Sequence, residues 1–230
     1  MKYIYCHPLF DERKCAHRFS YRLKTALEEK GLVLQRFDYC GTGEAPGEFA
    51  EVSLQSLRAD IVRQTEGDQV CLIGLRLGAS LALDYCVRGA GPAKTVVLIE
   101  PVVNGKTYVQ YLRRKQRIKN LMTRSSGREF QDDGYENIEG YKTSAKFISQ
   151  LENINLLEPA GAYSHANSVF IAGISNRQKI DPGLAALAKS LQGKARHVSV
   201  ENFVLPIFWE RIGPADCTEL TTAIARWCCG

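Results

Sequence analysis

Six short runs of apolar and β-branched residues recur along the chain, and helical patterns separate them. The runs cover residues 3–7, 33–39, 69–75, 95–101, 168–175 and 195–201. Each run is hydrophobic almost throughout, which is typical of strands covered on both faces in a parallel sheet. Because strands and helices alternate, the sequence predicts an α/β fold with a doubly wound, six-stranded, mostly parallel sheet and right-handed crossovers.

Amphipathic helical patterns fill the intervals between these strands. They cover residues 11–30, 53–64, 75–87, 182–191 and 217–227. Gly31 follows the first helix, where a left-handed stop is expected, and Ser53 is placed to cap the second. Each of these helices is long enough to cross from one parallel strand to the next.

The connection between the fourth and fifth strands, residues 102–167, is too long for a simple crossover. It contains two further helical patterns, about 106–122 and 144–151, with the polar stretch TRSSGREFQDDGYENIEG between them. Long insertions of this kind lie at the carboxyl ends of the strands, where ligand crevices form, and often act as lids. We therefore predict one domain over 1–230, with a helical lid inserted at 102–167.

Composition excludes several classes of protein. Of 230 residues, 45% are apolar and 24% are charged, so a chain of this length buries enough surface to fold without a disulfide or a metal. The net charge of +5 falls short of the dense basic stripe of a nucleic-acid-binding protein. The longest apolar runs are strand-sized, so we predict no transmembrane segment.

The eight cysteines do not follow the spacing of a metal site. The sequence has no CxxC pair, and several cysteines lie within strand or helix patterns. The start MKYIYCHPLF has no small-residue cleavage site, so no signal peptide is expected. We therefore expect reduced, mostly buried cysteines in a cytoplasmic protein with no metal and no cofactor.

The most specific motif lies in QVCLIGLRLGASLALDYC, residues 69–86. A strand leads into Gly74-Leu75-Arg76-Leu77-Gly78, and a helical pattern begins at once. Small residues at this spacing permit the sharp strand-to-helix turn of the nucleophile elbow, G-x-S-x-G. In this chain Arg76 stands where that pattern has serine.

Other segments resemble the α/β-hydrolases. FDYCGTGEAPGEF, residues 37–49, resembles a loop of that fold, and His7-Pro8-Leu9-Phe10 follows the first strand, where such enzymes keep an oxyanion-hole amide. Four further segments are similar to the bacterial exosortase-associated hydrolases, which accompany exopolysaccharide systems: GLRLGA, IEPVVNGKTYVQYLRRKQR, IEGYKTSAKFISQLENINL and LPIFWERIGPADCTELTTAIARW. The resemblance spans nearly the whole chain and implies an α/β-hydrolase fold. Members of one branch of that group have arginine at the elbow position, so the resemblance implies that Arg76 is typical of that branch.

Residue chemistry argues against serine hydrolysis. That reaction needs a nucleophile, a base and an orienting acid, and a guanidinium stays protonated and cannot attack a carbonyl. The acid is expected near 173–176 and the base near 202–209, and neither stretch holds a suitable residue. We therefore predict a pseudoenzyme. The alternative is an ester, thioester or peptide hydrolase with relocated groups, for which Cys40 and His7 are the weak candidates.

Two interpretations of Arg76 remain open. In the first, its guanidinium, the first-turn amide of Leu77 and the Leu9-Phe10 turn bind a small anionic or acyl ligand, with Glu100 beside them. In the second, Arg76 forms an internal ion pair with Glu100 or Asp38. Residues 206–209 (PIFW) add aromatic side chains that pack internally or form the rim of an acyl site.

The basic surplus is concentrated in the predicted lid. Residues 102–122 hold six cations and no acid, and an acidic stretch follows. The cations pair with that stretch, or they form a face for an anionic ligand, an acidic protein or a membrane surface. With an acidic protein as the partner, the chain is a protein-interaction module that uses the basic helix. The basic patch comprises Arg113, Arg114, Lys115, Arg117 and Lys119, and the acidic stretch comprises Glu129, Asp132, Asp133, Glu136 and Glu139.

Overall fold

A computed structural model describes residues 1–66, 69–89, 91, 93–123, 134–158 and 166–230. The acidic residues Glu129, Asp132 and Asp133 lie outside the described residues. The chain forms two compact units. The first comprises Met1–Phe37, Ile61–Val103 and Leu157–Gly230, and the second comprises Asp38–Asp60 and Asn104–Leu156.

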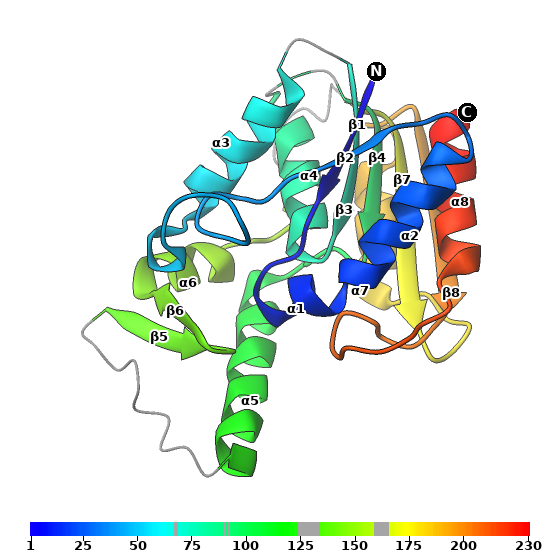
Figure 1. Ribbon diagram of the computed structural model, residues 1–230. Helices are drawn as coiled ribbons and strands as arrows, with labels where there is room; N and C mark the ends of the chain where they lie inside the picture. The colour runs from blue at the N-terminus through cyan, green and yellow to red at the C-terminus, as the bar shows by residue number, and fades with distance from the viewer. Residues whose placement is uncertain (67–68, 90, 92, 124–133, 159–165) are drawn as a thin grey trace. The chain divides into compact units, whose positions relative to one another are not determined.

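The first unit is built on a six-stranded sheet in which every pairing is parallel (Figure 1). All six predicted strands are present, in the spatial order β2-β1-β3-β4-β7-β8. The order reverses between β1 and β3, and ligands of such sheets bind at the carboxyl ends of the strands at that switch point. The strands are β1 (Lys2–Cys6), β2 (Leu34–Arg36), β3 (Val70–Leu75), β4 (Ala93–Ile99), β7 (Ala166–Ser175) and β8 (His197–Val204).

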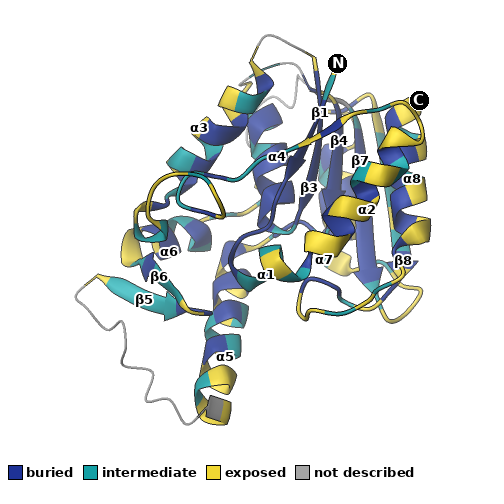
Figure 2. Ribbon diagram, viewed as in Figure 1, coloured by how far each residue is buried: buried dark blue, intermediate teal, exposed yellow. Residues whose placement is uncertain are grey.

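Alternate residues of the central strands face opposite sides of the sheet. On one side, Tyr5, Ile73 and Val97 stand in register on β1, β3 and β4 and belong to one buried apolar cluster. Side chains of α2 (His17–Glu28) and α8 (Thr218–Cys229) complete that cluster. The opposite side is covered in part by α4 (Leu77–Val87), which is buried almost all round (Figure 2).

One predicted helix is in fact two. Residues 11–30 were expected as a single helix, but α1 (Phe10–Cys15) ends before Ala16 and α2 begins at His17. Ala16 has ψ near 0°, outside the helical range, so the axis breaks there. The remaining helix of this unit, α7 (Pro182–Leu191), matches its prediction and is capped by the carboxylate of Asp181.

The second unit contains a hairpin that the sequence did not predict. Strands β5 (Tyr135–Ile138) and β6 (Tyr141–Ser144) pair antiparallel, and β5 lies within the stretch 123–140 that was interpreted as a polar loop. Glu139 and Gly140 form the two-residue turn, both with positive φ, 56° and 97°. The hairpin is accompanied by η1 (Phe49–Glu51), α5 (Gly105–Thr123) and α6 (Ala145–Glu152), and α3 (Leu54–Thr65) spans the division between the units.

Among the described residues, no helix combines the length and the apolar composition that crossing a bilayer requires.

Candidate functional site

Arg76 forms the apex of a sharp turn between β3 and α4. Its backbone has φ 54° and ψ −122°, a combination that costs a residue with a Cβ free energy. Two close approaches hold the turn. A Cβ on Gly78 would lie 2.1 Å from the carbonyl oxygen of Cys6, and a Cβ on Gly74 would lie 2.4 Å from Cα of Ala79. The two predicted glycines are therefore required by packing.

The guanidinium of Arg76 is held by two glutamates. Its Nε donates to Oε1 of Glu12 at 3.1 Å, and its Nη1 donates to the carbonyl oxygen of Glu100 at 3.1 Å. The same Nη1 lies 4.0 Å from Oε2 of Glu100. The Arg76 side chain is only 15% exposed, and its Cζ lies 5.4 Å from the centre of the Trp209 ring. The charge of Arg76 is thus compensated internally.

Glu12 is the partner that the sequence analysis missed. It lies on α1, which follows β1, and its side chain is completely buried. The partners expected from the sequence are Glu100 and Asp38. Asp38 accepts a hydrogen bond from the amide of Glu44 within the second unit. One feature of the sequence could have indicated Glu12 as a partner: it lies in the first helix after the switch-point strand β1, close to the apolar Leu9 and Phe10.

Glu100 occupies a second strained position, directly after β4, with φ 44°. Its Oε1 accepts a hydrogen bond from the amide of Ile174 at 2.5 Å. Burial raises the pKa of Glu100 above its usual value of 4.5, and the nearby charge of Asp181 raises it further. The Ile174 amide and Arg76 act in the opposite direction but only partly offset the effect of burial.

The other predicted ligand residues lie at the same edge of the sheet. Leu9 and Phe10 follow β1 and are buried, and Phe10 also has positive φ, 56°. Leu77 is buried and opens α4, so its amide is among the first-turn donors that a helix leaves unpaired internally. Phe10, Arg76 and Glu100 follow three adjacent strands. Backbone strain clusters in this way at functional sites.

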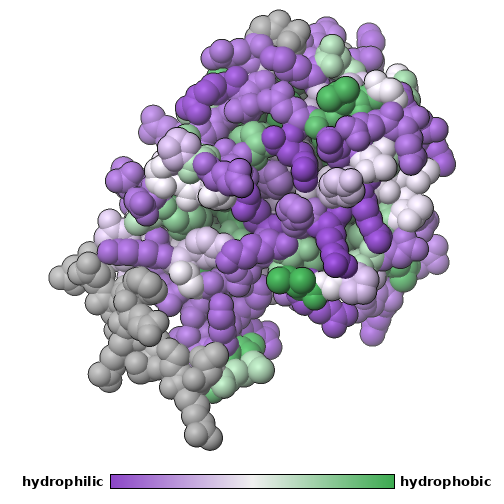
Figure 3. Space-filling view, in the orientation of Figure 1, coloured by the Kyte–Doolittle hydropathy of each residue, from purple (hydrophilic) through white to green (hydrophobic). Residues whose placement is uncertain are grey.

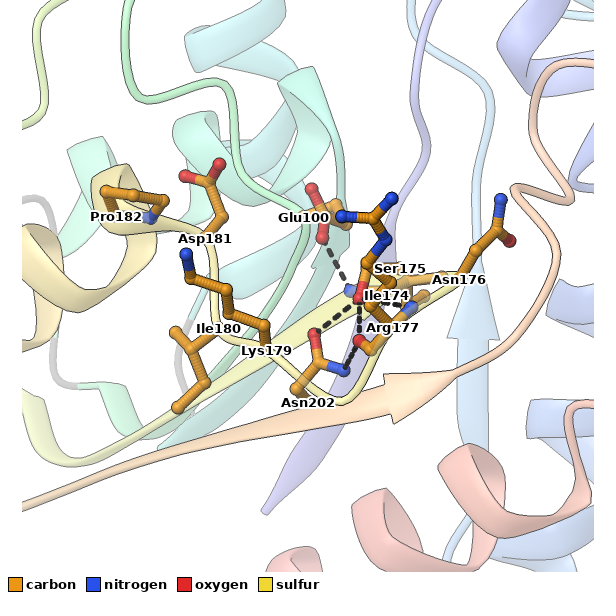
Figure 4. Close-up of a pocket in the computed structure, with 10 residues that line it drawn as sticks. All are labelled: Glu100, Ile174, Ser175, Asn176, Arg177, Lys179, Ile180, Asp181, Pro182 and Asn202. Carbon is orange, nitrogen blue, oxygen red and sulfur yellow. Dashed lines mark hydrogen bonds between the residues drawn. The ribbon is translucent and has the colours of Figure 1, made fainter.

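Glu100 also lines a cavity of about 400 Å³ (Figure 4). Ser175 donates to Oδ1 of Asn202 at 3.2 Å, and Nδ2 of Asn202 donates to the carbonyl oxygen of Arg177 at 3.0 Å, which shapes the loop after β7. Arg177 and Lys179 are exposed cations of this loop, and neither forms an ion pair within the described part of the chain. The lining residues are Glu100, Ile174, Ser175, Asn176, Arg177, Lys179, Ile180, Asp181, Pro182 and Asn202.

The weak catalytic candidates Cys40 and His7 belong to different units. The Cys40 thiol donates to Oδ1 of Asp60 at 3.2 Å, and the Cys40 amide donates to Oδ2 at 2.8 Å. His7 is buried and lies edge-on to Tyr5, with 4.7 Å between ring centres. Both side chains therefore have structural contacts within their own units.

The predicted aromatic rim is part of the core. Phe208 and Trp209 are both buried, and Phe208 stacks on Phe19 with 4.7 Å between ring centres. Packing, one of the two uses expected for these residues, is what the structure shows.

The predicted basic patch divides into two groups. Arg113 binds Glu136 through Nε and Nη2 at 2.9 and 2.6 Å, and it binds Glu152 at 2.9 Å. Lys115 forms an ion pair with the buried carboxylate of Glu139. The remaining three members, Arg114, Arg117 and Lys119, are exposed, and Nζ of Lys119 reaches the carbonyl oxygen of Glu139.

The described residues contain no group of three or more His, Cys, Asp or Glu side chains arranged to hold a metal ion. The thiols of Cys71, Cys86, Cys217 and Cys228 are buried. Burial raises the pKa of Cys86 to about 12 and that of Cys217 to about 11. Cys86 and Cys217 therefore hold little of the reactive thiolate at neutral pH.

Solved structures share this architecture over nearly the whole chain. Est1E from Butyrivibrio proteoclasticus, with bound ferulic acid, has a TM-score of 0.67 at 13% identity, covering 98% of this chain and 86% of that one. An esterase from Pyrococcus furiosus has a TM-score of 0.64 at 13% identity, covering 98% and 80%. The enol-lactonase from Burkholderia xenovorans has a TM-score of 0.62 at 13% identity, covering 98% and 89%.

No family model matches the chain, and no curated protein matches it in sequence. The chain has the α/β-hydrolase fold, as its strand order and these structures show. Identities this low establish the fold and leave the activity to be argued from the site.

Proposed function

We propose that this chain is a non-hydrolytic protein of the α/β-hydrolase fold that binds a small anionic ligand at the carboxyl edge of its sheet. The observation that carries the non-hydrolytic part of the proposal is Arg76 at the apex of the turn after β3, with its guanidinium held by buried Glu12. In the elbow pattern that position belongs to the nucleophilic serine.

Arg76 cannot replace a serine. A guanidinium remains protonated at any physiological pH and offers no lone pair to a carbonyl carbon. The buried ion pair with Glu12 also fixes the side chain, which supports a structural role for this residue. The similar esterases and the lactonase support only the fold, so they carry no argument for hydrolysis here.

We place the ligand in the cavity beside Glu100. Arg177 and Lys179 supply positive charge on its lining loop, where a phosphate or carboxylate is attracted. Glu100 lines the same cavity, and burial raises the pKa of its carboxyl above the usual value. The burial of Phe208 and Trp209 removes the aromatic surface expected for an acyl chain.

The biological setting is carried by the sequence resemblance to the exosortase-associated hydrolases. On that basis the chain acts as an accessory of a bacterial exopolysaccharide or protein-sorting system, with the insertion at 102–167 as its lid. Buried thiols favour a reducing compartment, in agreement with a cytoplasmic location.

Two measurements test the proposal. A fluorophosphonate probe and iodoacetamide are expected to give no stoichiometric, fold-dependent labelling of any single residue. Such labelling, if found, would falsify the non-catalytic role and favour a hydrolase with relocated groups. Inorganic phosphate is expected to raise the melting temperature, and Arg177→Gln is expected to remove that rise, whereas Lys189→Gln on the outer face of α7 leaves it. An unchanged rise in Arg177→Gln contradicts the cavity as the anion site.

A further inference from the structure

The last two turns of α5 expose apolar side chains to solvent. Ile118 is 47% exposed, Leu121 is 80% exposed and Met122 is 82% exposed. Within the same helix, Val109 and Leu112 are each 1% exposed, so α5 already has a buried apolar face on its other side. Ile118, Leu121 and Met122 therefore form a second apolar surface, separate from the core of the unit.

Basic side chains accompany this surface. At 100° per residue, Arg114 lies one turn before Ile118, and Arg117 lies one turn before Leu121, so both share the exposed face. Both are exposed, whereas Arg113 and Lys115 point to the sides and are bound by Glu136 and Glu139. α5 contains no acidic residue.

Figure 3 shows apolar side chains gathered at the C-terminal end of α5 among hydrophilic residues. An exposed cluster of large apolar residues has a cost in water that a monomeric protein tolerates mainly where the cluster binds something. The described part of α5 supplies no acidic side chain on this face to bind the two arginines.

We propose that this surface, which comprises Arg114, Arg117, Ile118, Leu121 and Met122, docks on an anionic membrane surface. The apolar side chains enter the boundary between headgroups and acyl chains, and the two arginines bind lipid phosphates. A bilayer suits a single convex helix face because it needs no complementary groove. The mixture of exposed arginine and bulky apolar residues on one face is typical of an interfacial helix.

The docking does not depend on the ligand proposed for the cavity. The residues of the docking surface belong to the second unit, and the residues that line the cavity belong to the first. Each arginine is expected to strengthen binding to anionic lipid about five-fold at physiological salt. With two arginines and three apolar side chains, the binding is expected to be weak and reversible, and to be screened by added salt.

Vesicle sedimentation tests this directly. The full chain is expected to sediment with vesicles of phosphatidylcholine containing 30% phosphatidylglycerol, to sediment far less with phosphatidylcholine alone, and to be released by 0.5 M NaCl. Leu121→Ser with Met122→Ser is expected to lower the vesicle partition coefficient at least ten-fold, and Arg114→Gln with Arg117→Gln about twenty-five-fold.

Matched controls come from the first unit. Ile212 is 80% exposed, so Ile212→Ser removes an equally exposed apolar residue, and Lys189→Gln removes an exposed cation. Both variants are expected to bind vesicles like the wild type. Far-UV circular dichroism and the melting temperature check that all variants fold.

Three outcomes overturn the proposal: no vesicle binding by the folded wild type, equal binding to both kinds of vesicle, or equal loss in the controls. A further contrary result is a dimer of the wild type that Leu121→Ser converts to a monomer without any vesicle binding. That result assigns the surface to a second copy of the chain.

Discussion

The Nε of Arg76 lies 3.1 Å from Oε1 of Glu12, and 64 residues separate the two in the sequence. The contact ties the turn after β3 to the helix that follows β1, across the switch point of the sheet. Glu100 adds a carbonyl acceptor from the turn after β4. Loops that follow three adjacent strands are therefore joined through one guanidinium.

Removal of Arg76 is expected to destabilise the fold strongly. In Arg76→Met, Glu12 becomes a buried carboxylate without its cation, which costs about 3 to 5 kcal/mol in the free energy of unfolding. The double variant Arg76→Met with Glu12→Leu is expected to recover most of that loss, because an apolar pair replaces a buried ion pair without leaving a charge. Urea denaturation measures both.

The matched control for Arg76 is the ion pair of Arg88 and Asp84 at the C-terminal end of α4. Nε of Arg88 lies 2.9 Å from Asp84, and the Arg88 side chain is 57% exposed. Arg88→Met is expected to cost less than about 1 kcal/mol. Equal costs for Arg76→Met and Arg88→Met contradict the structural role assigned to the Arg76–Glu12 pair.

Gly78→Ala is expected to prevent the turn from closing. The new methyl would lie 2.1 Å from the carbonyl oxygen of Cys6 and 2.4 Å from that of His7, and neither backbone atom can move freely. A loss above about 4 kcal/mol, or failure to fold, is expected. Gly213→Ala, with no heavy atom within 4 Å of the new methyl, is the control and changes stability by about 0.5 kcal/mol at most. Similar melting temperatures for the two variants contradict the packing argument.

Replacement of Glu100 is expected to show a pH signature. Because its folded pKa is raised above 4.5, the folded state holds the Glu100 proton more tightly than the unfolded state does. The resulting stability is present below about pH 4.5 and is lost as the pH rises through the folded pKa. A glutamine at this position does not titrate, so Glu100→Gln loses no stability as the pH rises. The stability of this variant relative to wild type should therefore rise with pH from about 4.5 to the folded pKa of Glu100. Denaturant titrations from about pH 4 to 8 that give a constant difference contradict this assignment.

Arg113→Lys is expected to loosen the β5–β6 hairpin without unfolding the chain. Lysine cannot reproduce the two-atom contact with Glu136 or hold Glu152 at the same time. The side chains of Glu136 and Glu152 are 40% and 34% exposed, so the cost is about 1 kcal/mol or less. Hydrogen exchange should therefore accelerate in β5 and β6 but not in β3. Arg114→Lys, one residue along α5, is the control, and equal acceleration in both variants contradicts the role of Arg113.

The strands were predictable because buried parallel strands have long apolar runs, which do not depend on distant contacts. The break at Ala16 was not predictable, because residues 11–30 keep one amphipathic pattern although the helix axis changes direction at Ala16. The hairpin was missed because its turn, Glu139-Gly140, lies within a polar stretch in which the short strands resemble a loop. Its positive φ at Glu139 becomes visible only in the folded backbone.

The site was predictable only in part, for a similar reason. The sequence placed Arg76 in the elbow because the two glycines have a local spacing. Its partner Glu12 lies on a helix that is otherwise amphipathic, and a glutamate on such a helix usually faces water. Burial of Glu12 follows from the pairing of β1 with β3, which no short motif of the sequence reports.

The geometry of the elbow has a consequence for how such turns persist. Here the sharp turn is imposed by the contacts that exclude a Cβ at Gly74 and Gly78, and not by the side chain at its apex. The turn between β3 and α4 is therefore required for packing, whatever residue stands at its apex. The apex residue can change from serine to arginine, with loss of the nucleophile, while the backbone of the turn stays the same.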